Sequence, residues 1–294
     1  MHQETFFLPS DLGGNGQRFY LFHPAQSIET RGLILYIHPF AEEMNKSRRM
    51  AAMQARALAI AGYAVLQIDL QGCGDSSGDF GDATWKNWVS DVVQGCRWLR
   101  QQGNANNSTR RPIPLWLWGL RAGCLLTVEA TAQLDEACNF LFWQSPSSGK
   151  LLLNQFLRLK MASGMLDGQT KGLMEDMRQK LESGSSIEIA GYMLSSKLAK
   201  GLEQALLIPP ARTGPSQRLD WFEISTRENA ILNPASKKII DQWQQMGFNV
   251  GIHLLSGPAF WQTSEIEEAP ALIAATTAAV SAYAPVTFMD AVAA

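Results

Sequence analysis

The chain has 294 residues, of which 46% are hydrophobic and 18% are charged, so it is long enough for one large α/β domain with an insertion or for two small domains. The formal net charge of −2 gives no electrostatic basis for nucleic acid or an anionic membrane as a partner. Because no stretch approaches the ~18 uncharged apolar residues of a membrane span, and no secretory signal opens the sequence, we expect a cytoplasmic protein.

The first half of the chain alternates short apolar runs with helical patterns. We expect strands at 19–22, 32–37, 64–69, 115–118 and 139–143. Helices are expected between them, over 46–61, 82–102 and 122–134. This alternation predicts βαβ units and a mostly parallel sheet flanked by helices.

The alternation stops at residue 145 and returns after residue 215. The segment between is helical in pattern, and is followed by a strand at 219–224, a helix at 234–246, a strand at 250–255 and a last helix over about 267–283. We therefore predict an α/β core formed by 1–144 and 216–294, with 145–215 inserted as a helical cap over the carboxyl edge of the strands, where ligands of open α/β sheets bind. The alternative is that these helices simply extend the core.

A nucleophile elbow is expected between the strand at 115–118 and the helix that follows. Gly119 and Gly123 flank Arg121 in a Gly-x-Arg-x-Gly pattern, which has the spacing of the α/β-hydrolase elbow with arginine in the place of the catalytic serine. The alternative is an ordinary strand–helix turn. An arginine stays protonated and offers no nucleophilic lone pair, so the pattern predicts the α/β-hydrolase fold without ordinary serine-hydrolase chemistry.

Ser76 lies in a second Gly-x-Ser-x-Gly match, from Gly74 to Gly78. This match follows an earlier strand, and no helix begins directly behind the serine. We expect a structural turn here and not a nucleophile.

The other members of a catalytic triad are also missing at their expected positions. The acid would follow the strand at 219–224, where Glu228 is the candidate; the base would lie in the loop 257–262, which contains Phe260 and no histidine. His253 falls inside a predicted strand and is expected to be a hydrogen-bonded sheet residue. A serine hydrolase needs a base within hydrogen-bonding distance of its nucleophile, so the triad is degenerate at Arg121, Glu228 and Phe260.

Cysteine could replace serine as a nucleophile, but the four cysteines give little support for this. Cys124 is about one turn into the helix after Arg121, and Cys73 follows an earlier strand; neither has a plausible histidine partner, and with Cys96 and Cys138 they show no C-x-x-C or zinc-like spacing. We expect buried thiols, no metal and no cofactor.

Three segments together are more specific than the fold. They are residues 39–50, residues 72–80 followed by Trp85 and Trp88, and residues 257–263 with Glu265 and Glu267; residues 118–123 and 155–159 fit the same pattern. In combination, and over nearly the whole chain, they resemble the exosortase A system-associated hydrolase 2 family. That resemblance implies a bacterial cytoplasmic protein encoded among genes for exopolysaccharide synthesis and PEP-CTERM protein sorting, with a partner in that system, and carries over no substrate.

Arg121 suggests what the site does in place of hydrolysis. A cation at the elbow, beside the Phe40 and Ala122 amides and a helix N-terminus, is suited to binding a carboxylate or phosphate, and Glu43 and Trp261 complete the expected set of ligand-binding residues. Alternatively, Arg121 pairs internally with a glutamate, for which the candidates are Glu42, Glu43 and Glu228. The protein would then be a scaffold or partner-binding module with a filled pocket and an exposed apolar patch on the cap.

A third possibility is an enzyme of unrecognised mechanism. Glu43 or Glu228 would then act as a general base that activates water. Its distinguishing feature would be a carboxylate with a raised pKa in a closed pocket beside Arg121.

Overall fold

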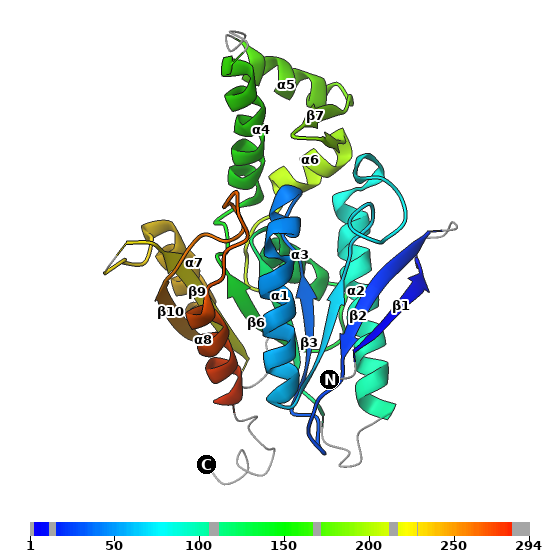
Figure 1. Ribbon diagram of the computed structural model, residues 1–294, viewed down its shortest axis with the longest axis vertical. Coiled ribbons are helices and arrows are strands. Elements are labelled where there is room, and N and C mark those ends of the chain that lie inside the picture. The colour runs from blue at the N-terminus through cyan, green and yellow to red at the C-terminus, as the bar shows by residue number, and fades with distance from the viewer. Residues whose placement is uncertain are drawn as a thin grey trace.

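The computed structural model describes residues 3–11, 16–105, 112–166, 172–211, 217–227 and 229–283. Within these residues the chain forms one large sheet with helices on both faces and a smaller, mostly helical part above one edge (Figure 1).

The large sheet has eight strands in the order β1-β2-β4-β3-β5-β6-β9-β10. Their bounds are β1 Glu4–Pro9, β2 Gln17–His23, β3 Gly32–Ile37, β4 Tyr63–Ile68, β5 Leu115–Leu120, β6 Cys138–Trp143, β9 Arg218–Ser225 and β10 Asn249–Ser256. β2 runs antiparallel to β1 and β4, and every other pairing is parallel. The predicted mostly parallel sheet is therefore confirmed, and β1 is a strand that the sequence analysis did not predict.

The central strands are buried on both faces. Every residue of β3, β5 and β6 is buried, which explains why these strands are continuous apolar runs without alternation. Leu33 and Leu35 face the core that contains helices α2 (Trp85–Ala105), α3 (Ala122–Thr131) and α7 (Pro234–Gln245). Ile34 and Tyr36 face the opposite core, beneath α1 (Glu42–Ile60) and α8 (Pro270–Ser281).

The segment between β6 and β9, which we call the cap, lies beyond the carboxyl ends of the parallel strands (Figure 1). It consists of α4 Gly149–Leu166, α5 Leu173–Glu182, the hairpin β7 Ile187–Ile189 and β8 Tyr192–Leu194, and α6 Ser196–Gln204. The expectation of a purely helical segment was wrong at the hairpin. Its two-residue turn, Ala190–Gly191, has positive φ at both positions, the conformation of a tight hairpin turn.

The cap packs closely on the core. A Cβ at Gly201 of α6 would lie 2.2 Å from the Cβ of Trp85 in α2, so only glycine permits this approach of the two helices. No helix among the described residues is both long enough and apolar enough to cross a membrane.

Candidate ligand site at the elbow

Arg121 occupies a sharp turn between β5 and α3. Its backbone has φ 54° and ψ −115°, a conformation that costs a non-glycine residue about 1–3 kcal/mol. A Cβ at Gly119 would lie 2.5 Å from the Cys124 amide nitrogen, and one at Gly123 would lie 2.2 Å from the Ile37 carbonyl oxygen. The two glycines are therefore required by close backbone contacts, and the turn has the geometry of a nucleophile elbow.

The Arg121 side chain forms an internal ion pair with Glu43. Its Nε lies 3.2 and 3.3 Å from the two carboxylate oxygens of Glu43, and its Nη2 lies 3.1 Å from Oε1. Both residues are buried, at 7% and 8% exposure. Of the glutamates considered as partners from sequence, the structure pairs Glu43 with the arginine.

The same guanidinium also contacts the cap. Arg121 Nη2 donates to Gln155 Oε1 of α4 at 2.8 Å, and the Arg121 Cζ lies 5.9 Å from the ring centroid of Trp261. The arginine thus joins the elbow, the first helix, the cap and the loop after β10. Trp261 was expected at this site from the sequence, whereas Gln155 was not expected as a partner of Arg121.

Glu43 is held at the start of α1. Ala41, which precedes the helix, has φ 49°, and the Ser47 hydroxyl donates to the Glu43 carbonyl oxygen at 2.6 Å. Burial raises the pKa of the Glu43 carboxyl, and the charge and hydrogen bonds of Arg121 oppose only part of that increase. Burial raises the pKa of the neighbouring Glu42 as well.

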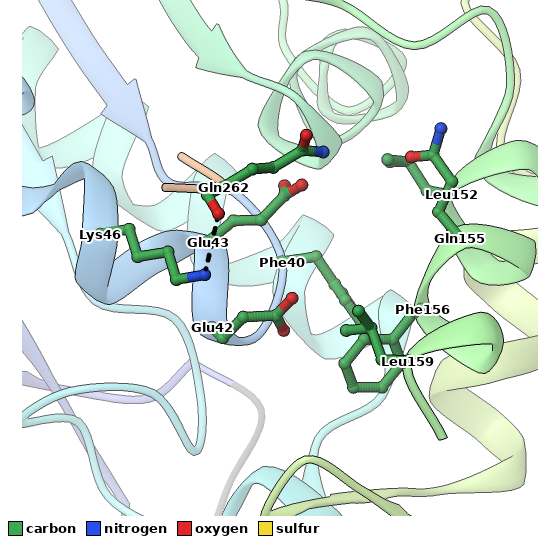
Figure 2. Close-up of a pocket in the computed structure, with 9 residues that line it drawn as sticks. All are labelled: Phe40, Glu42, Glu43, Lys46, Leu152, Gln155, Phe156, Leu159 and Gln262. Atoms are coloured by element: carbon green, nitrogen blue, oxygen red, sulfur yellow. Dashed lines mark hydrogen bonds between the residues drawn. The ribbon is translucent and has the colours of Figure 1, made fainter. Parts of the chain in front are cut away.

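A cavity of about 380 Å³ lies between α1 and α4, beside the ion pair. Figure 2 shows Glu42 and Glu43 on one side and the cap residues Gln155 and Phe156 on the other, with Phe40 between them. The lining combines polar side chains from Glu42, Glu43, Lys46, Gln155 and Gln262 with apolar ones from Phe40, Leu152, Phe156 and Leu159. Gln262 is a lining residue that the sequence did not predict.

The two amides expected to bind an anion lie in the loop after β3 and at the start of α3. Within the described residues, neither the Phe40 amide nor the Ala122 amide donates a hydrogen bond to a protein acceptor. Their role in ligand binding remains a prediction.

The expected base position is filled by packed aromatic residues. Phe260 is fully buried, with its ring centroid 6.2 Å from that of Trp143 and 5.1 Å from that of Trp261. No proton acceptor is available from this side chain. The expected acid, Glu228, lies outside the described residues.

His38 and His253 are engaged elsewhere, and His23 lies in β2 at the antiparallel pairing with β4. His38 Nδ1 lies 2.7 Å from the Pro39 carbonyl oxygen, and its Nε2 accepts from the Leu70 amide at 3.2 Å, so it braces the loop after β3. His253 contacts Asp220 at 2.9 Å within the sheet and stacks on Phe222, which confirms its assignment as a sheet residue.

The alternative nucleophiles are structural residues. Ser76 is buried, accepts from the Phe19 amide at 2.9 Å and donates to the Asp69 carbonyl oxygen, so the expected structural turn is confirmed. The Cys124 thiol contacts the Gly119 carbonyl oxygen, and burial raises its pKa to about 12; burial also raises the pKa of Cys73. Such thiols are neutral near pH 7 and therefore poor nucleophiles.

Within the described ranges, no group of three or more histidine, cysteine, aspartate or glutamate side chains is arranged to hold a metal ion.

Known proteins resemble this chain in two ways. A family model for the X-Pro dipeptidyl-peptidases of the S15 family matches residues 18–109, which end before the elbow. Among solved structures, the ferulic-acid-bound Est1E of Butyrivibrio proteoclasticus aligns with a TM-score of 0.62 and 13% identity over 94% of this chain and 96% of that one. A thermostable carboxyl esterase from Bacillus coagulans aligns with a TM-score of 0.62 and 12% identity over 96% and 97%.

The chain has the α/β-hydrolase fold. A soluble variant of the monoglyceride lipase of Saccharomyces cerevisiae gives a TM-score of 0.58 at 14% identity, over 94% of each chain. No match is found among curated proteins. At identities this low the likeness extends to the α/β-hydrolase architecture and not to chemistry, which depends on the site.

Proposed function

We propose that this α/β-hydrolase-fold protein is a ligand-binding protein that does not work as a serine hydrolase. The observation that carries the proposal is Arg121 at the apex of the elbow, whose ion pair with Glu43 lies beside an open cavity, where the scaffold alternative expected a filled pocket. Removing the serine alone from a triad enzyme lowers kcat by a factor on the order of 10⁶. Here the base position also holds a buried phenylalanine, Phe260.

The ligand would occupy the cavity between the elbow and the cap. A volume of about 380 Å³ suits a small molecule, since ligand pockets measure roughly 300–1,000 Å³. The sequence suggested a carboxylate or phosphate, held by Arg121 with the Phe40 and Ala122 amides. The ion pair to Glu43 bears directly on that charge preference, because it already compensates the charge of Arg121.

The resemblance to the exosortase A system-associated hydrolases supports a biological setting. We infer a cytoplasmic protein of the exopolysaccharide and PEP-CTERM sorting system, with a ligand or protein partner from it. A sugar-phosphate, acyl or polyprenyl-phosphate fragment would suit that system.

A second candidate is an active hydrolase with a non-standard site. The observation that favours it is Glu43, a buried carboxyl with a raised pKa beside Arg121 and a cavity. These are features of a general base. Glu43 would then deprotonate a water molecule for attack on an ester.

Fluorophosphonate labelling and a short-chain ester assay test the two candidates. The purified protein is compared with Arg121→Ala, Glu43→Gln and, as a control away from the cavity, Ser76→Ala. We expect neither labelling nor turnover in any of them. Suppose that the wild type turns over the ester, that Glu43→Gln abolishes this activity and that Ser76→Ala retains it. That result would establish the active hydrolase and overturn the non-hydrolytic ligand-binding protein.

A further inference from the structure

We propose that the site selects an uncharged ligand, whose carbonyl oxygen replaces Gln155 Oε1 on Arg121 Nη2, over the carboxylate of the same size. This inference rests on the proposed function, because it requires the cavity to bind a ligand. An arginine at the elbow, considered alone, suggests a negatively charged ligand. The ion pair with Glu43 points to an uncharged ligand instead.

The positive charge of Arg121 is already balanced within the protein. Glu43 already compensates the guanidinium through three contacts of 3.1 to 3.3 Å, and both side chains are buried. A ligand carboxylate at Arg121 would place a second negative charge beside that of Glu43. Like charges at such distances repel strongly where water is excluded.

The charges around the whole cavity are balanced as well. Three ionisable side chains line the cavity, all from α1: Glu42, Glu43 and Lys46. Arg121 of the elbow contacts Glu43 and Gln155 at the edge of this cluster. The polar residues that α4 and the loop after β10 contribute, Gln155 and Gln262, are neutral. The two negative charges match the two positive ones. Glu42 Oε2 is moreover buried and accepts no hydrogen bond within the described residues, so this wall offers an acceptor and no surplus of positive charge.

Of the contacts of Arg121, the one to Gln155 is the contact that a ligand can replace at the least cost in free energy. Displacing Glu43 would leave a buried carboxylate without its partner, which is strongly unfavourable. Gln155 is neutral, belongs to the cap and is exposed, so its amide can turn to water with little penalty. The hydrogen that Arg121 Nη2 now donates to Gln155 Oε1 at 2.8 Å then becomes available to a ligand oxygen.

The apolar lining completes the description of the ligand. Phe40, Phe156, Leu152 and Leu159 would contact an aryl or alkyl group, and aromatic side chains bury large areas in such contacts. The chemical class is therefore a small ester or amide with an apolar acyl group, bound through its carbonyl oxygen.

A matched pair of probes tests this selectivity. Phenylacetamide and phenylacetate differ in charge but hardly in size, and the amide resists hydrolysis. Their dissociation constants are measured by calorimetry at pH 7.5 with the wild-type protein and with Glu43→Gln; Glu268→Gln, an identical change at a residue paired with Arg49 outside the cavity, is the control.

We expect the wild type and Glu268→Gln to bind the amide on the order of ten-fold more tightly than the carboxylate. We expect Glu43→Gln to reverse this preference, because Arg121 then lacks a counterion. If Glu43→Gln does not fold, Gln155→Ala provides the second test, since it frees Nη2 and should tighten amide binding several-fold.

The possible failures are distinguishable. Tighter binding of phenylacetate to the wild type, or unchanged amide binding in Gln155→Ala, overturns the inference and leaves a ligand-binding function standing. Binding of neither probe to any variant overturns both the inference and the proposed function.

Discussion

Arg121 combines two features that are rarely found in one residue. Its backbone has a positive φ, and its side chain belongs to a buried ion pair. The glycines at 119 and 123 determine the first feature, because any Cβ there would meet backbone atoms. Glu43 determines the second. The turn therefore depends on the two glycines, whereas the burial of a positive charge at position 121 depends on the carboxylate of Glu43.

The first prediction concerns the stability of this pair. Arg121→Leu should lower the free energy of unfolding by about 3–5 kcal/mol, because it leaves the Glu43 carboxylate buried without a partner. The double variant Arg121→Leu/Glu43→Leu should recover most of this loss. Urea denaturation of the two single variants and the double variant measures the coupling, and simple additivity would contradict the pairing.

The second prediction concerns the missing base. Arg121→Ser restores a hydroxyl to the elbow, but His38 and His253 lie in other contacts and Phe260 fills the base position. We expect no ester turnover above that of the wild type. Appreciable esterase activity in this variant would show that another group near the elbow accepts the serine proton.

At the scale of elements, the sequence was most informative where a strand is buried on both faces. The predicted strand at 32–37 coincides with β3, and the expected helix over 122–134 begins where α3 begins. β1 was missed because it is an edge strand with little buried surface, and the cap hairpin was missed because strands of three residues contain less than two periods of alternation. The Ala190–Gly191 turn was the feature of the sequence that could have indicated this hairpin.

The residues of the candidate site were harder to predict than the elements. Arg121 and Glu43 could be named because the elbow and the helix after β3 have recognisable patterns. Gln155 and Gln262 come from the cap and from the loop after β10, whose positions relative to the elbow depend on tertiary packing. No local pattern marks such residues.

The third prediction concerns the packing of α6 on α2. Gly201→Ala should lower the free energy of unfolding by about 1–3 kcal/mol, because the new methyl group overlaps Trp85 and forces the helices apart. Lys200→Ala, an exposed change in the same helix, should have little effect. Thermal denaturation followed by circular dichroism compares the two, and equal melting temperatures would contradict the close contact.

The fourth prediction concerns β9 and β10. Burial would raise the pKa of the Asp220 carboxyl, but the hydrogen bond from His253 and the bonds and charge of Arg218 outweigh it and hold this pKa below its ordinary value. Ionised Asp220 therefore stabilises the fold above the pKa of an unfolded aspartate, about 3.9, and this contribution is lost as the pH falls through the lower, folded pKa.

The comparison with Asp220→Asn makes that dependence measurable. The wild type should be more stable than the variant at pH 6–7, and the difference in unfolding free energy should shrink as the pH is lowered below about 4. Urea denaturation across this range provides the values. A difference that stays constant with pH would contradict a charge-dependent role for Asp220.

At the scale of the whole molecule, the cap and the α/β core share one hydrophobic cluster. Leu152, Phe156 and Leu202 of the cap belong to the same buried group as Leu35 of β3 and Trp88 of α2. The division into a core and an inserted cap remains a prediction. The shared cluster indicates that the two parts depend on each other for stability.

The fifth prediction follows from this shared cluster. The cap and the core should unfold together in one transition. Tryptophan fluorescence reports the core, and hydrogen exchange of α4 and α6 amides reports the cap. Coincident denaturant midpoints are expected, and earlier exchange of the cap would contradict a common core.

The Gln155–Arg121 contact has a consequence for the time a ligand would remain bound. If the cap unfolds only together with the core, as the fifth prediction states, entry and exit depend on side chains at the mouth of the cavity. Exposed side chains such as Gln155 and Leu159 change rotamer in picoseconds to nanoseconds, whereas hinged lids move in microseconds to milliseconds. The residence time of a ligand would then depend on its affinity and not on the motion of a lid. The bound fraction of the protein would follow changes in ligand concentration without a delay from lid opening.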